Sequence, residues 1–177
     1  MRSHADTATH RVATTGSLLA LACVLGLVES LLVVPLPVPG LRLGLANIAV
    51  VIAFALLGPK SALVVTVGRV VIVGLATGTL FGPVSAMSLT GALAAWAVMA
   101  VLASRGQTFS CVGWSVGGSA ANVLGQLLAA SALAGTLTPL VLLPVSLALS
   151  LPSGMGVGFA ARALVSRVSR PVVSFVG

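Results

Sequence analysis

The sequence predicts an all-α membrane protein, a polytopic bundle of six transmembrane helices with both termini in the cytoplasm. Hydrophobic residues make up 58% of the 177 residues and charged residues only 6%, whereas an ordinary soluble domain is about 25% charged. The apolar residues form blocks close to the length of about 20 residues that a helix needs to cross a bilayer. Basic residues lie at the edges of these blocks, as the positive-inside rule requires.

The same composition excludes several other classes of protein. A soluble fold would expose large apolar patches, and a disordered chain needs low hydrophobicity. The net charge of +7 does not indicate nucleic-acid binding, because the basic residues are scattered rather than gathered on one face. Cys23 and Cys111 lie within apolar runs, so we interpret both as small core residues rather than metal ligands or a disulfide framework.

Turn-forming residues divide the apolar sequence into six blocks. The Pro-rich segment 35–40 ends the first block, Gly58-Pro59-Lys60 ends the second, and Gly82-Pro83 ends the third. Polar or Gly- and Pro-containing turns at 104–107 and 135–139 end the next two. The expected spans are 13–35, 42–58, 61–80, 84–104, 109–133 and 137–165. A polar tail, 1–12, precedes the transmembrane domain, 13–167, and a second tail, 168–177, follows it.

The distribution of basic residues favours an even number of spans. With a cytoplasmic N-terminus, Arg42 falls outside and Arg69 falls within a span, while the remaining basic residues fall inside. Those inside are Arg2, Arg11, Lys60, Arg105, Arg162, Arg167 and Arg170. An odd number of spans would place the C-terminal arginines outside. We therefore expect a multi-pass protein of the cytoplasmic (inner) membrane.

Two ionisable residues fall within the predicted spans. Glu29 lies about 24 Å into the first helix, in the outer half of the bilayer, and Arg69 lies about 13 Å beyond Lys60. Each needs a physical reason, because an ionisable group in the bilayer costs several kcal/mol. A structural Glu29–Arg69 ion pair is one interpretation, and an Arg69 that meets an anionic ligand is another. Both can hold, because a ligand anion competes for the same guanidinium.

Further polar residues fall at a similar outer-half depth. Arg42 follows the Pro-rich turn, and Asn47 lies just beyond it in the second block. Asn122 and Gln126 are four residues apart, so they share one helix face, at about 20 and 26 Å from the cytoplasmic side. Together with Glu29 they predict a polar pocket that opens outward. The alternatives are a solvated Arg42 and amides that only hydrogen-bond between helices.

Small residues recur in the first block, where Gly16 and Ala20 form one small-xxx-small pair and Ala22 and Gly26 form another. Such pairs let helices approach closely. They indicate either packing within the bundle or a docking face for another membrane subunit.

No catalytic constellation is visible in the sequence. Glu29 is the only acidic residue within the predicted spans, so paired carboxylates for acid–base work or Mg²⁺ binding are missing. The sequence also lacks a GxxxxGK[ST] phosphate-binding loop. We therefore expect no enzyme activity, no cofactor and no metal site, and energy for any transport would come from a partner or a gradient.

Several motifs together resemble a known family of bacterial membrane proteins. The run Val-Pro-Gly-Leu-Arg-Leu-Gly-Leu-Ala-Asn-Ile at 38–48 resembles the most characteristic stretch of the heptaprenyl diphosphate synthase component I family, also called the Gx transporter family. Supporting matches are Leu-Val-Glu-Ser at 27–30, Ala-Leu-Leu-Gly-Pro-Lys at 55–60, Gly-Arg-Val at 68–70, Phe-Gly-Pro at 81–83 and Ala-Asn-Val-Leu-Gly-Gln-Leu at 121–127. The resemblance covers about residues 16–135 and weakens in the last helix.

The two family labels imply different functions. The synthase label implies an accessory role in polyprenyl diphosphate or menaquinone metabolism, since the Asp-rich motifs of a catalytic subunit are missing. The transporter label implies similarity to the S components of energy-coupling-factor transporters, six-helix bundles that bind vitamins near the outer face and dock on a shared transmembrane subunit through small residues of the first helix. An assembly subunit whose polar residues only lock helices is a third alternative.

The transporter label implies a vitamin-like solute and an energising transmembrane or ATPase module as partner, whereas the synthase label implies a quinone-related or isoprenoid-related molecule. The residues expected to bind the solute are Glu29, Arg42, Asn47, Arg69, Asn122 and Gln126. The residues expected to dock a partner are Gly16, Ala20, Ala22 and Gly26.

The six-span topology makes a testable prediction about the first two turns. In a background in which Cys23 and Cys111 are replaced by Ser, a membrane-impermeant maleimide added to intact cells should label Pro37→Cys and leave Lys60→Cys unlabelled. Permeabilised cells, in which both positions should react, provide the control. Labelling of both positions from the same side would refute the six-span topology.

Overall fold

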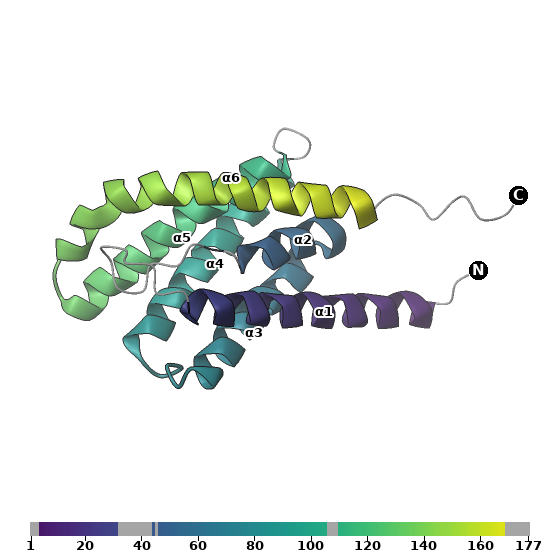
Figure 1. The fold of residues 1–177 in the computed structure, drawn as a ribbon, viewed down its shortest axis with the longest axis horizontal. Coiled ribbons are helices and arrows are strands. Elements are labelled where there is room, and N and C mark those ends of the chain that lie inside the picture. Colours follow the sequence, from purple (N-terminus) through teal and green to yellow (C-terminus); the bar gives the residue numbers. More distant parts are fainter. Residues whose placement is uncertain (1–3, 32–43, 45, 106–109, 169–177) are drawn as a thin grey trace, which may run out of the picture.

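The protein is entirely helical over the residues that this computed structural model describes, which are 4–31, 44, 46–105 and 110–168. That part of the chain contains six α-helices and one short 3-10 helix, as Figure 1 shows. They are α1 (His4–Leu31), α2 (Asn47–Leu57), α3 (Pro59–Ala76), α4 (Pro83–Ser104), α5 (Cys111–Ala134), η2 (Thr138–Leu142) and α6 (Leu143–Val168). The all-α prediction and the number of six helices are confirmed.

Five helical segments of the described chain are long and apolar enough to cross a membrane, namely α1, α3, α4, α5 and η2 with α6. The exception is α2, which has 11 residues and reaches about 17 Å. A hydrocarbon core is about 30 Å thick, so α2 does not fill the span expected at 42–58. The first helix also differs from the expectation, because α1 begins at His4, inside the predicted polar tail.

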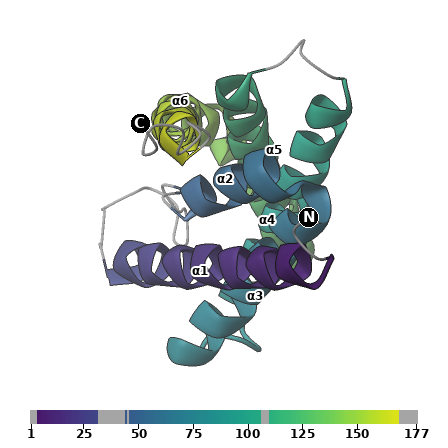
Figure 2. The same ribbon diagram turned by 90° about the vertical axis from the view of Figure 1, so that its right-hand side faces the viewer.

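The short helix α2 forms the centre of the bundle. It contacts α1, α3, α5 and α6, and Figure 2 shows it between α1 and α6. Every residue from Ala49 to Phe54 is buried, as expected for a helix that is apolar all round. The longer helices instead leave large apolar side chains exposed, among them Val64, Leu75 and Phe159. Apolar side chains on the outside fit a lipid environment. The described chain therefore has a buried core that includes α2 and an apolar outer surface on the longer helices.

Turn residues set where the helices end and reverse. Gly58 has a φ of 85° between α2 and α3, Pro59 opens α3, and Gly135 ends α5 with a φ of 66°. Glycine reaches this left-handed region without steric cost, and proline fits the first helical position because its missing N–H has no partner there anyway. The Ser110 hydroxyl accepts a hydrogen bond from the Gly113 N–H and caps α5.

The helices alternate in direction in spite of the short α2. Arg11 Nη2 donates a hydrogen bond of 3.1 Å to the Leu57 carbonyl, so the end of α2 lies beside the first part of α1. Figure 1 shows that α1 begins and α6 ends at this same end of the molecule. The start of α1 and the end of α6 thus lie at one end of the bundle, as an even number of spans requires, while the number of spans and the cytoplasmic placement of this end stay predictions.

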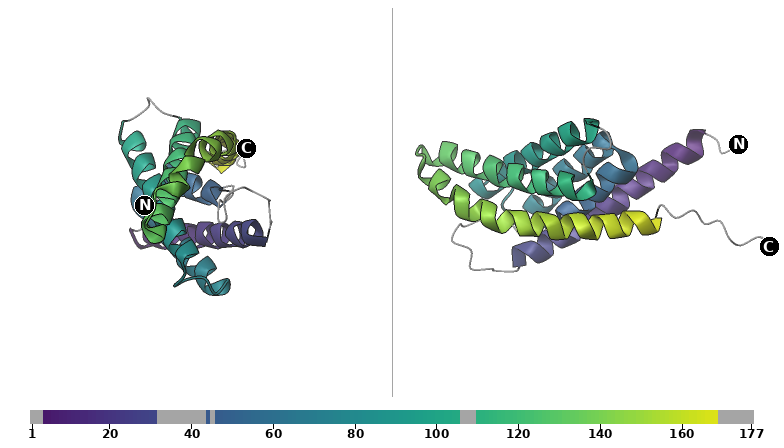
Figure 3. Two further views of the ribbon diagram at one scale, coloured as in Figure 1. Left: turned by 90° about the vertical axis from the view of Figure 1, so that its left-hand side faces the viewer. Right: turned by 90° about the horizontal axis from the view of Figure 1, so that it is seen from above.

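Glycines bring α4, α5 and α6 into close contact, and both views in Figure 3 show α5 and α6 side by side. A Cβ added at Gly125 of α5 would lie 2.9 Å from the Gly91 Cα and 3.0 Å from the Thr90 carbonyl oxygen of α4. On the other side of α5, the Ser115 hydroxyl donates a hydrogen bond of 2.7 Å to the Gly154 carbonyl of α6. Small residues thus act in packing within the bundle.

Replacement of Gly125 by Ala should destabilise the protein, because the added methyl group would meet backbone atoms that cannot rotate away. Overpacking of this kind costs about 1–3 kcal/mol. Gly156→Ala is the matched control, since a Cβ there meets nothing within 4 Å and alanine favours the helix. Thermal unfolding in detergent should show a lower midpoint for Gly125→Ala alone, and equal midpoints for the two variants would contradict the close contact.

Candidate functional site

A small polar cavity lies inside the bundle, where α2, α3, α4 and α5 meet. Its volume is about 20 Å³, which is enough for about one water molecule. The described residues that line it are Gly44, Asn47, Arg69, Val70, Ser88, Asn122 and Gln126. A cationic side chain, three amides and a hydroxyl therefore face one enclosed point within an otherwise apolar protein.

Arg69 is the only cation at this cavity among the described residues, and 8% of its surface is exposed. It projects from the buried face of α3, which also carries Thr66 and Val73. Gly26 of α1 faces this part of α3. A Cβ there would lie 3.2 Å from Val73 Cγ2, which is a tight contact, and 4.0 Å from Arg69 Cγ, which is an ordinary one. Gly26 thus serves the close packing of α1 against Val73.

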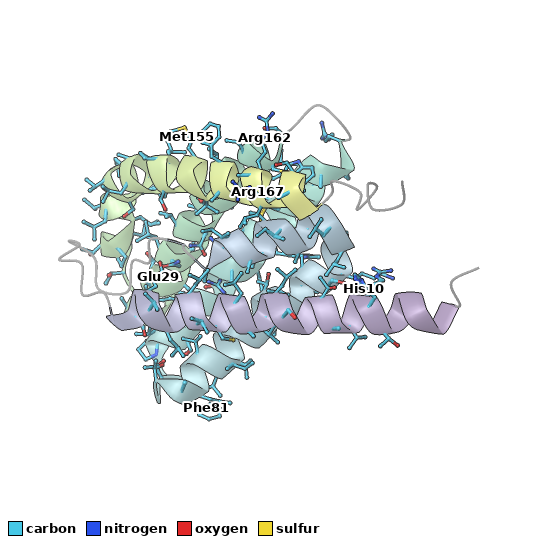
Figure 4. The ribbon with its side chains drawn as sticks, turned by 45° about the vertical axis from the view of Figure 1, so that its right-hand side comes forward. His10, Glu29, Phe81, Met155, Arg162 and Arg167 are labelled. Atoms are coloured by element: carbon cyan, nitrogen blue, oxygen red, sulfur yellow. The ribbon has the colours of Figure 1, made fainter. Side chains whose placement is uncertain are left out.

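Glu29 holds the turn that precedes α2. Its side chain is 6% exposed, and its Oε1 accepts a hydrogen bond from the Gly44 N–H. Gly44 has a φ of 79°, and its carbonyl accepts a hydrogen bond of 2.9 Å from the Asn47 N–H. Glu29 thereby links α1 to the cavity through Gly44. It lies toward the end of the molecule opposite to His10, as Figure 4 shows. The expected Glu29–Arg69 ion pair stays a prediction.

Asn122 and Gln126 reach the cavity from the same face of α5, as their spacing predicts. Both are buried, and both lie against Gly91 of α4. A Cβ at Gly91 would be 2.6 Å from Gln126 Cγ and 2.7 Å from Asn122 Oδ1. Glycine at this position is therefore what allows the two amides to fit between α4 and α5.

The structure brings together four of the six residues expected to bind a solute. Asn47, Arg69, Asn122 and Gln126 line one cavity, and Glu29 reaches it through Gly44. Arg42 lies outside the described residues. That these residues bind a solute stays a prediction.

Sequence reasoning missed Ser88 and Gly44, which also line the cavity. Ser88 precedes Gly91 by three residues on α4, so the two share a helix face. That spacing was the available signal for Ser88. The signal for Gly44 was a glycine three residues before Asn47, where α2 starts.

The four small residues of α1 fall on different faces of the helix. Ala22 and Gly26 are buried against the chain's own helices, whereas Gly16 and Ala20 are exposed. A Cβ at Gly16 would meet nothing within 4 Å. The first pair is thus accessible to a partner and the second pair is occupied in packing.

The chemistry available at the cavity is charge and hydrogen bonding. Within the described ranges, no group of three or more His, Cys, Asp or Glu side chains is placed to hold a metal ion. Both cysteines are free thiols, with Cys23 buried and Cys111 half-buried. The arrangement can bind an anion or a hydrogen-bonding group at Arg69 and orient it with amides.

Apolar helices of spanning length around a buried polar cluster define an integral membrane protein of the helical-bundle class. The family is identified by comparison with known families. The chain belongs to the family described as heptaprenyl diphosphate synthase component I, whose model matches residues 18–164. The match takes in all six expected site residues and most of α6, so it extends beyond the stretch where the motifs resemble the family. No similar curated protein and no similar solved structure was found.

The role of Glu29 as a hydrogen-bond acceptor can be tested by two substitutions. Glu29→Ala should lower the free energy of unfolding by about 1–3 kcal/mol, because the part-buried Gly44 N–H loses its acceptor. Glu29→Gln keeps an acceptor oxygen and should lose less. Thermal unfolding in detergent provides the comparison, and equal losses in the two variants would show that the negative charge matters rather than this hydrogen bond.

Proposed function

We propose that the protein is a solute-binding subunit of a membrane transport system, similar to the S components of energy-coupling-factor transporters. One observation carries this proposal: polar side chains from α2, α3, α4 and α5 converge on one cavity, in a bundle whose other buried polar side chains, among the described residues, are Glu29 and Ser or Thr hydroxyls. Buried polar groups in a membrane bundle are costly and commonly mark a pathway or a binding site. The protein would act in the cytoplasmic membrane, with both termini inside and with energy supplied by a partner module.

The side chains at the cavity favour an anionic solute. Arg69 offers a fixed fork of donors that matches a carboxylate or phosphate. Asn47, Asn122 and Gln126 each offer both a donor and an acceptor, so they can orient hydroxyl or amide groups of the same solute. The described helices contain two acidic residues, Glu29 and Asp6, and Asp6 lies near the start of α1. A solute anion would bind at the Arg69 guanidinium, and Glu29 would remain the acidic side chain on the Gly44 side of the site.

The size of the cavity sets a condition on binding. Space for about one water molecule does not admit a vitamin-sized solute, whose pockets are commonly 300–1,000 Å³. The lining side chains must separate when such a solute enters. The solute would thus bind a more open arrangement of these side chains than the one in this structure.

The description of the family favours a second candidate function, a non-catalytic accessory component in polyprenyl diphosphate or menaquinone metabolism. Diphosphate chemistry with Mg²⁺ uses clustered carboxylates, and the whole chain has only two acidic residues. Its role would then be to hold an isoprenoid substrate or product in the membrane beside a partner synthase component. Arg69 would suit a phosphate in this case as well, so the two candidates differ in the hydrocarbon part of the ligand.

The ligand retained through purification distinguishes these functions. Protein purified in mild detergent should carry a small anionic solute that mass spectrometry identifies. Arg69→Lys keeps the charge but loses the planar fork, so it should retain at least about tenfold less, equivalent to about 1.4 kcal/mol. Arg105→Lys is the matched control, because Arg105 lies at the end of α4 and does not line the cavity.

Each outcome has a definite meaning. A retained polyprenyl phosphate or quinone would establish the accessory function in place of transport. If no ligand is retained, and if Arg69→Lys and Asn122→Ala only lower the thermal unfolding midpoint, the polar cluster locks helices together and the binding proposal is wrong.

A further inference from the structure

A second, larger hollow lies on the outside of the bundle, between the first half of α1 and the beginning of α3. It is an open groove of about 590 Å³, far larger than the internal cavity and separate from it. Its floor is formed where Gly16 lacks a side chain, and a Cβ at Gly16 would meet nothing within 4 Å. No part of the proposed solute site lines this groove.

The groove is polar at one end and apolar along its length. Arg11 of α1 and Lys60 of α3 lie at one end of the groove. The Thr15 hydroxyl lies about one turn beyond Arg11, and Ser61 directly follows Lys60. Beyond these groups, the walls are formed by Leu19 of α1 and Val64 of α3. A ligand that fits this pattern has an anionic head and a hydrocarbon chain.

The guanidinium of Arg11 is held in place at the mouth of the groove. Its Nη2 donates to the Leu57 carbonyl at 3.1 Å, which uses one of five N–H donors. Lys60 follows directly at the start of α3 and is exposed. The end of α2 thus holds the Arg11 guanidinium, and Lys60 lines the same groove. Two cations at one site suit a phosphate group with several acceptor oxygens.

The protein itself has little negative charge to balance these cations. It contains nine basic and two acidic residues, and Glu29 accepts the Gly44 N–H near the other end of α1. The Thr15 hydroxyl donates to the Arg11 carbonyl within α1. With nine basic and two acidic residues in the chain, a large part of the counter-charge for its basic residues comes from outside the chain.

We propose that the groove between α1 and α3 binds an anionic membrane glycerophospholipid, with its phosphate at Arg11 and Lys60 and one acyl chain along Leu19 and Val64. Charge complementarity and the apolar walls carry this assignment. The groove begins at the end of the spanning helices, where lipid headgroups lie, and a basic residue near an anionic membrane surface contributes attraction of about 1 kcal/mol. The proposal does not depend on what the internal cavity binds.

Titration of the purified protein with phosphatidylglycerol or phosphatidylcholine, followed by native mass spectrometry, tests the headgroup. The double variant Arg11→Gln/Lys60→Gln should bind phosphatidylglycerol at least about tenfold more weakly than the wild type. Arg105→Gln/Arg167→Gln removes the same charge from the ends of α4 and α6 and should bind it nearly as well as the wild type.

A second variant tests the groove without changing charge. Gly16→Leu places a side chain in the open space and should weaken phosphatidylglycerol binding by a similar factor, with an unchanged thermal unfolding midpoint in phosphatidylcholine. Gly156→Leu is its control, because Gly156 of α6 also faces open space and does not line the groove.

Three results would overturn the proposal. Equal losses in the two double variants would mean that charge acts diffusely and not at this groove. Equal binding of phosphatidylglycerol and phosphatidylcholine by the wild type would mean that the phosphate is not recognised by the two cations. Tighter binding of a prenyl diphosphate than of phosphatidylglycerol, abolished by Gly16→Leu, would assign the groove to a different ligand.

Discussion

The burial of Arg69 is the constraint on which the interior of this bundle depends. A guanidinium cannot lose its charge in a protein, so the helices around it must supply polar groups and space. Asn47, Asn122 and Gln126 supply the polar groups from two other helices. Gly91 supplies space beside the amides. A glycine of α4 that looks like general packing is thus tied to the polar cluster that contains the arginine.

The same constraint accounts for the short central helix. Residues 42–58 read as one apolar block because Leu43 and Leu45 extend the run, but α2 begins only at Asn47, after Gly44 in its left-handed conformation. The turn at Gly44 brings a backbone N–H to Glu29 and an amide to the cavity. Around Gly44 and Asn47 the chain thus makes polar contacts, and the apolar helix occupies only the residues that follow.

The sequence was sufficient to predict how deep a residue lies along its helix. It was not sufficient to predict which way the side chain faces around the helix axis. Depth follows from the fixed rise of the helix, which is why Asn47, Asn122 and Gln126 were expected near one level and do line one cavity. Rotation requires knowledge of which face packs inward. Ala20 and Ala22 differ by about 200° around the helix axis, and the structure buries Ala22 while it exposes Ala20. Ser88 was missed for a related reason, since a serine in an apolar helix is common and only its neighbours give it meaning.

The shortage of acidic residues connects the interior with the surface. Nine basic and two acidic residues leave the chain unable to neutralise both its buried arginine and its basic end. Inside, Glu29 is a buried carboxylate that accepts the Gly44 N–H beside the cavity. At the surface, the bilayer itself supplies the negative charge. Lipid at the basic end would hold α1 and α3 in place without altering the cavity, because no residue lines both the groove and the cavity. Lipid binding at the basic end and solute binding at the centre are therefore separable properties of a chain with this charge imbalance.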